Sequence, residues 1–559
     1  MEESRALRQE PAGQAAPPMR GPRTPQRSGF ARESAPVAST NGTAIRVPSW
    51  AYPVVTVFSV LIGAAAIVRG TRAVASISDS DLTNFFFKSA RYILNGHPWQ
   101  MYAVRASGGY PNYNPPLSMF LMAPLLRLAH TLHFDANFGE QITFVALPFI
   151  VFVPLLGYLV LRVLRSLYPE MPETQRLLAF VLVVLSPLTW QSIATWYHLE
   201  QPMMLCFLVA ALLAFQRRQE GLAGVLAGLA LVSRTTALIP LVALGVLLLT
   251  HREWRGLLKL GGVAALVAAV VLGPFFLADR TDFMYSFVSW RGTATIGGNS
   301  IWSIFAYGGS GGIRHSLDAL ARRLDMPSVV VFVAIVAFLA ARRLRVSAYS
   351  RDAWAILAIA ALAVPMLSKT NWPYYYLEPF ILLLVWEFAS MHDRVAGVWR
   401  WPVLSFGFLV VAATLSQYIG LQSVGAFDRI SVGLLEFGAM LAFVVAIWLR
   451  MRAAKPEAAG YASPPGLAGP AGFVGATGSA ASAWPAPSRP IAPAGGTSPL
   501  WPAEGPRPSA QAPAPPPNGS FSSGALPPST RGVAPDNAGS LRDLPQSWPD
   551  LDAGWPPKA

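Results

Sequence analysis

Two carboxylates stand one residue apart directly after the first apolar segment of the chain. Asp79 and Asp81 belong to the sequence Ser-Asp-Ser-Asp, which precedes Leu-Thr-Asn-Phe-Phe-Phe-Lys. A carboxylate of this kind can take a proton from a hydroxyl group as a general base. A carboxylate that precedes a helix can equally serve as its N-cap, and the residues after Asp81 have a helical pattern. Both interpretations are open for Asp81, with Asp79 as the second candidate.

The residues that follow Asp81 have the pattern of a helix that lies along a membrane surface. Apolar residues recur at helical period over Leu82–Leu94, with polar residues on the other side. Gly96 suits the end of such a helix. Aromatic and proline-rich segments follow at His97–Tyr102 and Tyr110–Pro116. For these segments, an interfacial aromatic belt and a platform for a sugar or lipid are both open.

A single charge interrupts a long apolar stretch in the middle of the chain. Arg234 is the only charged residue between Gly221 and Thr250. Charges inside membrane segments are usually functional, and an arginine suits a phosphate group. The alternative is a residue at the wet tip of a hairpin. The interruption predicts two short helices that meet near Arg234.

Other polar residues lie where apolar runs begin or end. His198 and Glu200 fall in a short turn between two such runs, and Lys369 precedes an aromatic segment. A phosphate-binding or sugar-positioning role and a solvated loop are the two readings of the His198–Glu200 pair. Asn299 lies in a glycine-rich loop at 291–312, which is either a lid or a connector. The histidines show no metal-ligand spacing, so we expect no metal.

The composition is that of a membrane protein with many spans. Of the 559 residues, 53% are hydrophobic and 13% are charged, against about 25% charged in soluble proteins. We predict an all-α polytopic fold of about twelve transmembrane helices. The net charge of +14 comes from basic residues in short loops, so membrane orientation explains it without nucleic acid. A single cysteine, Cys206, excludes a disulfide framework.

Apolar segments long enough to count as spans recur through the chain. Besides the divided stretch 221–250, we predict them at 49–68, 141–163, 177–195, 201–216, 258–278, 328–341, 353–367, 374–389, 402–421 and 431–449.

The distribution of arginine and lysine predicts cytosolic N- and C-termini. Basic residues gather in alternate loops, which places the loops 69–140 and 279–327 outside the cytosol. Asp79 and Asp81 also match an Asp-x-Asp motif for metal and nucleotide sugar, but nucleotide sugars are cytosolic and this pair is external. Three regions follow: a disordered cytosolic arm at 1–46, a membrane domain at 47–452 and a disordered cytosolic tail at 453–559. The tail is either dispensable or a docking site for a proline-reading partner.

The order of these elements resembles the GT-C class of integral-membrane glycosyltransferases. Within that class it is similar to glycosyltransferase family 87, whose members use polyprenol-phosphate mannose. The resemblance covers about residues 50–450. Its closest matches are Asp81, Phe85, Leu94, Gly96, Pro98, Tyr102 and Tyr113-Asn114-Pro115-Pro116-Leu117. Looser matches are His198-Leu199-Glu200-Gln201-Pro202, Arg234 with Pro240, Asn299-Ser300 and Trp372-Pro373-Tyr374-Tyr375-Tyr376.

The resemblance implies a GT-C-like bundle with interfacial helices in its first external loop. It also implies inverting transfer of a hexose, with mannose the family's sugar, from a polyprenyl-phosphate donor to a glycan or glycolipid at the external face of a bacterial plasma membrane. No cofactor is implied. Asp81 would be the general base, and Arg234, His198 and Lys369 would bind the donor phosphate. The residues that would position the substrates are Glu200, Tyr113, Asn114, Trp372, Tyr374 and Asn299.

Two other classes of membrane protein are alternatives. A transporter or flippase of a lipid-linked substrate also uses broken helices, although no internal repeat is evident. A polymerase or ligase of surface polysaccharide would place its key arginines and histidine in a large late loop. The loop 279–327 carries such residues, which are Arg280, Arg291, Arg314 and His315.

Overall fold

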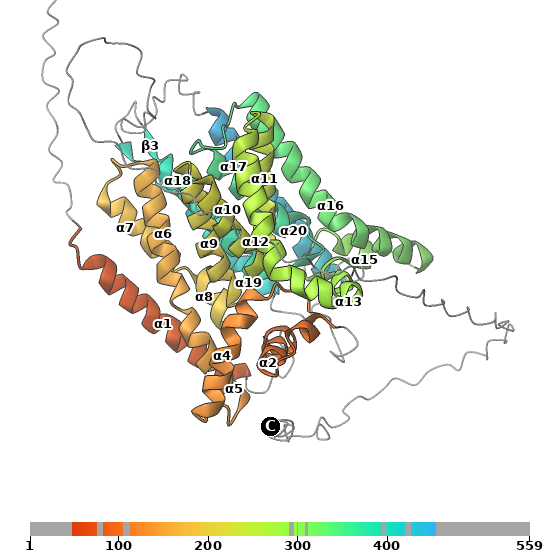
Figure 1. The fold of residues 1–559 in the computed structure, drawn as a ribbon. Coiled ribbons are helices and arrows are strands. Elements are labelled where there is room, and N and C mark those ends of the chain that lie inside the picture. Colours follow the sequence, from red (N-terminus) through yellow and green to blue (C-terminus); the bar gives the residue numbers. More distant parts are fainter. Residues whose placement is uncertain are drawn as a thin grey trace, which may run out of the picture. The chain divides into compact units, whose positions relative to one another are not determined.

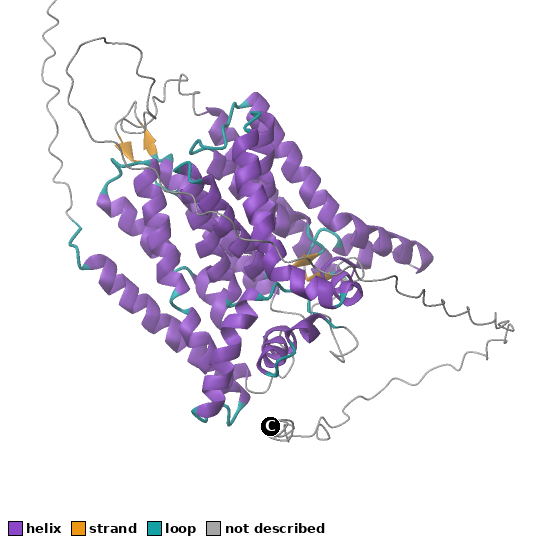
Figure 2. Ribbon diagram, viewed as in Figure 1, coloured by secondary structure: helices purple, strands orange, loops and turns teal. Residues whose placement is uncertain are grey.

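Helices make up nearly all of the described chain (Figures 1 and 2). A computed structural model describes residues 47–74, 82–103, 112–289, 296–298, 300–307, 311–393, 398–399, 401–419 and 426–453. These residues all belong to one unit, Met1–Ala468. The predicted arm at 1–46 and all but the first residue of the predicted tail lie outside the described residues, as do Asp79, Asp81 and Asn299.

The all-α prediction is confirmed for the described chain. The first half contains α1 (Ala51–Val74), η1 (Leu82–Phe87), α2 (Lys88–Leu94), η2 (Pro98–Tyr102), α4 (Leu117–Thr131), α5 (Phe138–Phe149), α6 (Phe152–Leu167), α7 (Glu173–Val184), α8 (Pro187–Ala194), α9 (Glu200–Gln216), α10 (Glu220–Ser233), η3 (Thr235–Ala237), α11 (Leu238–Thr250) and α12 (Trp254–Ala278). The second half contains α13 (Arg280–Met284), η4 (Tyr285–Ser289), α15 (Ser303–Tyr307), α16 (Gly311–Arg343), α17 (Ala353–Leu367), η5 (Pro373–Tyr376), α18 (Leu377–Ala389), α19 (Val403–Ile419) and α20 (Ala426–Ala453).

Strands are limited to two-residue pairs in the described chain. β1 (Gly297–Gly298) pairs in parallel with β2 (Thr370–Asn371). β3 (His392–Asp393) pairs antiparallel with β4 (Val398–Trp399). The first pair brings the loop after η4 beside the segment that enters η5, although about seventy residues separate them in sequence.

Fewer helices reach membrane length than the twelve predicted. Six described helical segments are long and apolar enough to cross a bilayer: Ala51–Thr71, Phe138–Leu167, Glu173–Ala194, Trp254–Ala278, Ala319–Arg343 and Arg429–Ala453. The other apolar segments form shorter helices. α9, α17 and α18 have 17, 15 and 13 residues. At 1.5 Å per residue they measure about 20–26 Å, below the roughly 30 Å of a hydrocarbon core.

The short apolar helices form the centre of the bundle. Every residue of α17 from Ala353 to Met366 is buried, and so is every residue of α18. A helix that is apolar on all sides belongs inside a bundle, because it has no polar face for solvent. α12, in contrast, exposes Leu258, Leu266 and Leu277. Its outer face is therefore suited to lipid.

The predicted break at Arg234 is confirmed. α10 ends at Ser233, and Arg234 has extended backbone with φ −159° and ψ 134°. The single turn η3 then leads into α11. Gly224 and Gly228 let α10 pack closely on α12, since a Cβ at Gly228 would lie 2.5 Å from Val267 Cβ. The interruption thus places an arginine at the junction between α10 and η3.

The helix predicted after Asp81 is also present. A π-helical turn, η1, continues directly into α2. Gly96 ends it with φ +75°. The Gly96 N–H donates to Ile93 O at 3.1 Å and the His97 N–H donates to Tyr92 O at 2.9 Å, which is a Schellman motif. Leu82, Phe86 and other apolar residues of this segment are buried, as their spacing predicts.

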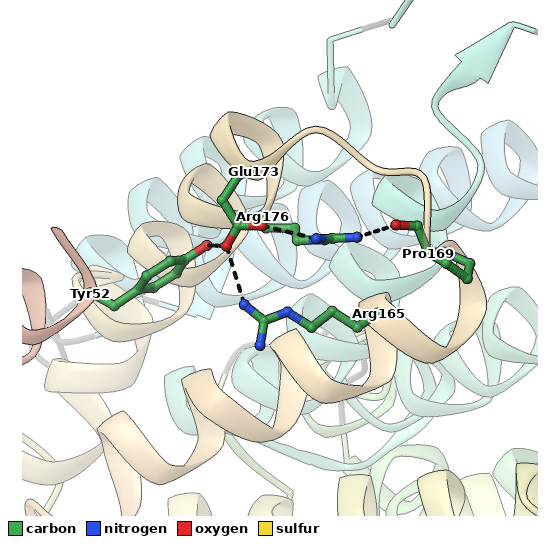
Figure 3. Close-up of polar contacts among 5 residues, drawn as sticks. All are labelled: Tyr52, Arg165, Pro169, Glu173 and Arg176. Carbon is green, nitrogen blue, oxygen red and sulfur yellow. Dashed lines mark hydrogen bonds and ion pairs between the residues drawn. The ribbon is translucent and has the colours of Figure 1, made fainter. Parts of the chain in front are cut away.

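A polar cluster fastens the N-terminal end of α1 to the connection between α6 and α7 (Figure 3). The Tyr52 hydroxyl donates to Glu173 Oε1 at 2.6 Å, and Arg165 Nη2 donates to the same oxygen at 3.2 Å. Arg176 donates to Glu173 Oε2 at 2.9 Å and to Pro169 O at 2.6 Å. Glu173 therefore ties three helices together at this end of the bundle.

Candidate functional site

Arg234 is the centre of a buried polar cluster. Its side chain has 7% exposure, and its Nη1 donates to Glu200 Oε1. His198 Nδ1 lies 2.7 Å from Glu200 Oε1 and 3.1 Å from Arg234 Nη1. Buried charges persist when they are paired and hydrogen-bonded, so Glu200 offsets the desolvation of the guanidinium. The two sequence candidates from the α8–α9 turn thus meet the candidate from the α10–η3 junction.

Aromatic rings cover this cluster. Arg234 Cζ lies 4.8 Å from the ring centre of Tyr374 and 5.5 Å from that of Tyr375. The His198 ring centre is 3.7 Å from that of Tyr374. Rings within about 6 Å of a guanidinium attract it through their quadrupoles. The entry to η5 therefore supplies an aromatic wall beside the cation.

A narrow pocket opens on the cluster. It is lined by Tyr113, Asn114, His198, Arg234, Thr235, Thr236, Tyr374 and Tyr375. These residues come from four parts of the chain: the segment before α4, the α8–α9 turn, the α10–η3 junction and η5. Each of these residues lies next to a helix end or in a single 3-10 turn, and none lies in the middle of a long helix.

Hydrogen bonds hold the segment before α4 in place. The Tyr102 hydroxyl donates to Asn114 O at 2.9 Å. Asn112 accepts from the Asn114 N–H at 2.9 Å and donates to Ser89 Oγ at 2.9 Å. Since Ser89 lies in α2, the helix after Asp81 is fixed against the wall of the pocket.

The turn η1 also packs against the site. The Phe85 ring lies 5.2 Å from that of Tyr113, and the Phe86 ring lies 6.2 Å from that of His198. Leu82, the residue after Asp81, is fully buried. The segment that Asp81 precedes is therefore a neighbour of both Tyr113 and His198.

Several buried polar atoms near Arg234 lack a hydrogen-bond partner within the described chain. They are Arg234 Nε, Glu200 Oε2 and both side-chain polar atoms of Gln201. Buried polar atoms are paired in roughly 90% of cases or more, so such a concentration is unusual. A guanidinium with an unused N–H beside a pocket can donate to a ligand.

One further carboxylate was missed in the sequence. Glu378, in the first turn of α18, has 4% exposure and interacts electrostatically with Arg234. An acid in the first turn of a largely apolar helix is itself a signal, because charges are costly there.

The remaining candidates lie apart from the pocket or outside the described residues. Lys369 is buried, and its Nζ donates to Arg322 O at 3.3 Å. The carbonyl of Lys369 accepts from Ser300 Oγ at 3.2 Å. Lys369 is not among the residues that line the pocket. Trp372 packs on Trp196 with ring centres 5.7 Å apart, next to the pocket. Asp79, Asp81 and Asn299 are not described.

No cluster of three or more His, Cys, Asp or Glu side chains suited to a metal ion occurs among the described residues. The Arg234 guanidinium and the hydroxyl and amide groups that line the pocket suit an anionic ligand held by hydrogen bonds.

Comparison with known proteins assigns part of the chain to a family. The sequence model described as glycosyltransferase family 87 matches residues 112–368. No curated protein matched the chain. The matched range includes Tyr113, His198, Glu200 and Arg234, whereas η5 and α20 follow it. The chain carries a glycosyltransferase family 87 domain over residues 112–368, and the protein is a glycosyltransferase.

Proposed function

We propose that the protein transfers a hexose, with mannose the first candidate, from a polyprenyl-phosphate sugar to a glycan or glycolipid acceptor at the external face of the plasma membrane. One observation supports this most directly. Arg234, the only charge in a thirty-residue apolar stretch, is buried beside a pocket with an unused N–H. An arginine in such surroundings suits the phosphate of a membrane-embedded donor.

The reaction needs a cation where the phosphate leaves. The acceptor oxygen forms a bond to the anomeric carbon as the bond from that carbon to the phosphate oxygen breaks, and configuration inverts. Negative charge then develops on the departing phosphate. Arg234 would offset it without reorganisation, because Glu200 and the Tyr374 ring already hold the guanidinium.

Asp81 is the proposed general base for the acceptor proton. Its support is the chain itself: Asp81 is bonded to Leu82, and consecutive Cα atoms lie about 3.8 Å apart. The turn that begins at Leu82 contacts Tyr113 and His198 through Phe85 and Phe86. A base one residue before that turn would serve the same pocket.

Replacement of Asp81 tests the base and the donor class together. In membranes carrying the full chain, wild type should transfer label from polyprenol-phosphate mannose and not from a nucleotide sugar. Asp81→Asn should lose about 100-fold or more in rate, as expected for a missing base. Asp79→Asn, the matched control, should retain most of the activity.

Two results would overturn parts of this proposal. Equal transfer by wild type, Asp81→Asn and Asp79→Asn would remove Asp81 as the base. Absence of transfer from any lipid-phosphate sugar would remove the donor class and favour a transporter or a polysaccharide ligase.

The external location has its own test. A reporter that is active only outside the cytosol, fused after Ala106, should be active because alternate loops carry the basic residues. The same reporter fused after Arg218 should be silent. The opposite pair of signals would place the site on the cytosolic face.

A further inference from the structure

A second hollow lies between α1 and α8, apart from the pocket at Arg234. Its volume is about 390 Å³. α1 contributes Ala66, Arg69 and Gly70 to its lining, and α8 contributes Trp190, Gln191 and Ala194. The two cavities share no lining residue. We call this hollow the α1–α8 groove.

Two glycines of α1 bring the helices close enough to form the groove. A Cβ at Gly63 would lie 2.1 Å from a ring atom of Trp190. A Cβ at Gly70 would lie 2.4 Å from the carbonyl oxygen of Ala194. Both distances are shorter than any packed side chain allows, so glycine at these positions fixes the crossing of α1 over α8.

The groove combines apolar walls with polar groups that lack partners. Arg69 is exposed and makes no hydrogen bond or ion pair with any described residue. Gln191 Oε1 and the Tyr197 hydroxyl are buried without a hydrogen-bond partner in the described chain. The Tyr197 oxygen lies 3.1 Å from the position of a Cβ on Gly70, which lines the groove, so Tyr197 lies behind this part of its wall. Burial raises the pKa of Tyr197 to about 12, so its hydroxyl keeps a proton to donate.

These groups suit a ligand that has both an apolar part and a negative charge. The ring of Trp190 and the methyl groups of Ala66 and Ala194 suit a hydrocarbon chain. Arg69 is a guanidinium, which binds phosphate oxygens through paired N–H groups. A small soluble anion would leave the apolar wall unused, whereas a neutral lipid would leave Arg69 without a counter-charge.

We propose that the α1–α8 groove binds an anionic membrane lipid, with its phosphate at Arg69 and its chain against Trp190 and Ala66. This site is separate from the donor pocket and does not depend on the identity of the donor.

The turn after α8 connects the groove to the glycosyltransferase site. Tyr197 has φ +53°, in the left-handed region that bulky residues rarely adopt. Its neighbour Trp196 packs against Trp372, and its other neighbour His198 lines the donor pocket. A lipid that lies against Gly70 and Thr195 would therefore lie beside the turn that carries Tyr197 and His198.

Native mass spectrometry of the full chain in detergent tests the proposal. The probe is dioleoyl phosphatidylglycerol, with dioleoyl phosphatidylcholine as the zwitterionic comparison. Wild type should bind the anionic lipid more tightly. Arg69→Gln should weaken that binding about tenfold, as for one lost charged hydrogen bond, and leave the zwitterionic lipid unchanged. Arg69→Lys should retain most of it, and Ala66→Trp should weaken both lipids by filling the groove.

Two controls make the result specific. Arg162→Gln removes an exposed arginine of α6 that makes no ion pair with a described residue, and it should bind as wild type does. Arg234→Gln should also retain phosphatidylglycerol, so a wrong donor assignment leaves this measurement unaffected. Thermal unfolding confirms that each variant is folded.

Three outcomes would overturn the proposal. Wild-type affinity of Arg69→Gln for phosphatidylglycerol would remove Arg69 as the ligand. An equal loss in Arg162→Gln would indicate general attraction to surface arginines. Loss in Arg234→Gln alone would place the bound lipid in the donor pocket.

Discussion

Glu200 supplies the counter-charge of the Arg234 guanidinium. The carboxylate is fully buried, and its Oε1 contacts both Arg234 Nη1 and His198 Nδ1. A buried arginine without such a counter-charge would bear the whole cost of desolvation. A phosphate that enters the pocket can share this role, because it brings its own negative charge.

Glu200→Gln should therefore destabilise the protein but make its stability sensitive to phosphate. We expect a loss of about 3 kcal/mol or more, since one partner of a buried pair is removed. Addition of a short-chain polyprenyl phosphate should then raise the Tm of the variant more than that of wild type, as scanning calorimetry would show.

Glu253→Gln is the matched control for Glu200→Gln. Glu253 pairs with Arg218 at 3.5 Å on the exposed surface, where such pairs contribute less than about 1 kcal/mol. If Glu200→Gln unfolds as wild type does and shows no larger phosphate shift, Glu200 is not the counter-charge of Arg234.

At the scale of elements, α20 supports the aromatic wall of the site from outside the family-matched range. Glu436 has 1% exposure, and its Oε1 accepts hydrogen bonds from Asn371 Nδ2 and the Tyr376 hydroxyl. A Cβ at Gly433 would lie 2.3 Å from Ser300 O, so α20 packs closely on the segment beside Lys369. The segment from Asn371 to Tyr376 carries Trp372 and Tyr374 between these two anchored residues.

Glu436→Ala should raise the donor KM, because it removes the acceptor of the Tyr376 hydroxyl and one of the two acceptors of Asn371 Nδ2, and so loosens this segment. Glu436→Gln retains an acceptor oxygen and should restore most of the wild-type KM. Radiolabelled transfer at varied donor concentration measures both.

Glu387→Ala is the control that distinguishes an effect on donor positioning from a general loss of stability. Glu387 is also buried, but it accepts from the N–H groups of Leu404 and Ser405 and from Arg450. Its loss should lower stability without a change in donor KM. An equal rise in KM for the Glu387 and Glu436 variants would mean that Glu436 only stabilises the bundle.

Sequence pattern was most informative where an element ends. Arg234 interrupts an apolar run, and Gly96 closes an amphipathic one, so both helix breaks were predictable. His198 and Glu200 were recognisable as polar residues beside a break. Tyr197 was not, because its meaning depends on which helices pack around it.

The number of spans was harder to predict than their positions. Every apolar segment named from the sequence contains a helix, yet several helices are only 13–17 residues long. A count of apolar residues does not show that a helix is surrounded by protein rather than lipid. α17 and α18 are the clearest cases, since they are buried along their lengths.

At the scale of the molecule, the site needs parts of the chain on both sides of the family-matched range. Phe86 precedes residue 112, whereas Tyr374 and Glu436 follow residue 368. The matched range alone holds Arg234, His198 and Glu200 but lacks the aromatic wall. Segments from η1 to α20 thus contribute to the surroundings of one buried arginine.

The most direct test of this account is donor use by Arg234 variants in native membranes. Arg234→Gln should lower transfer from polyprenol-phosphate mannose by about 100-fold or more, the loss typical of one removed donor to a developing charge. Arg234→Lys should retain part of the rate, since it keeps the charge but not the forked geometry. Wild-type transfer by a folded Arg234→Gln variant would contradict the account.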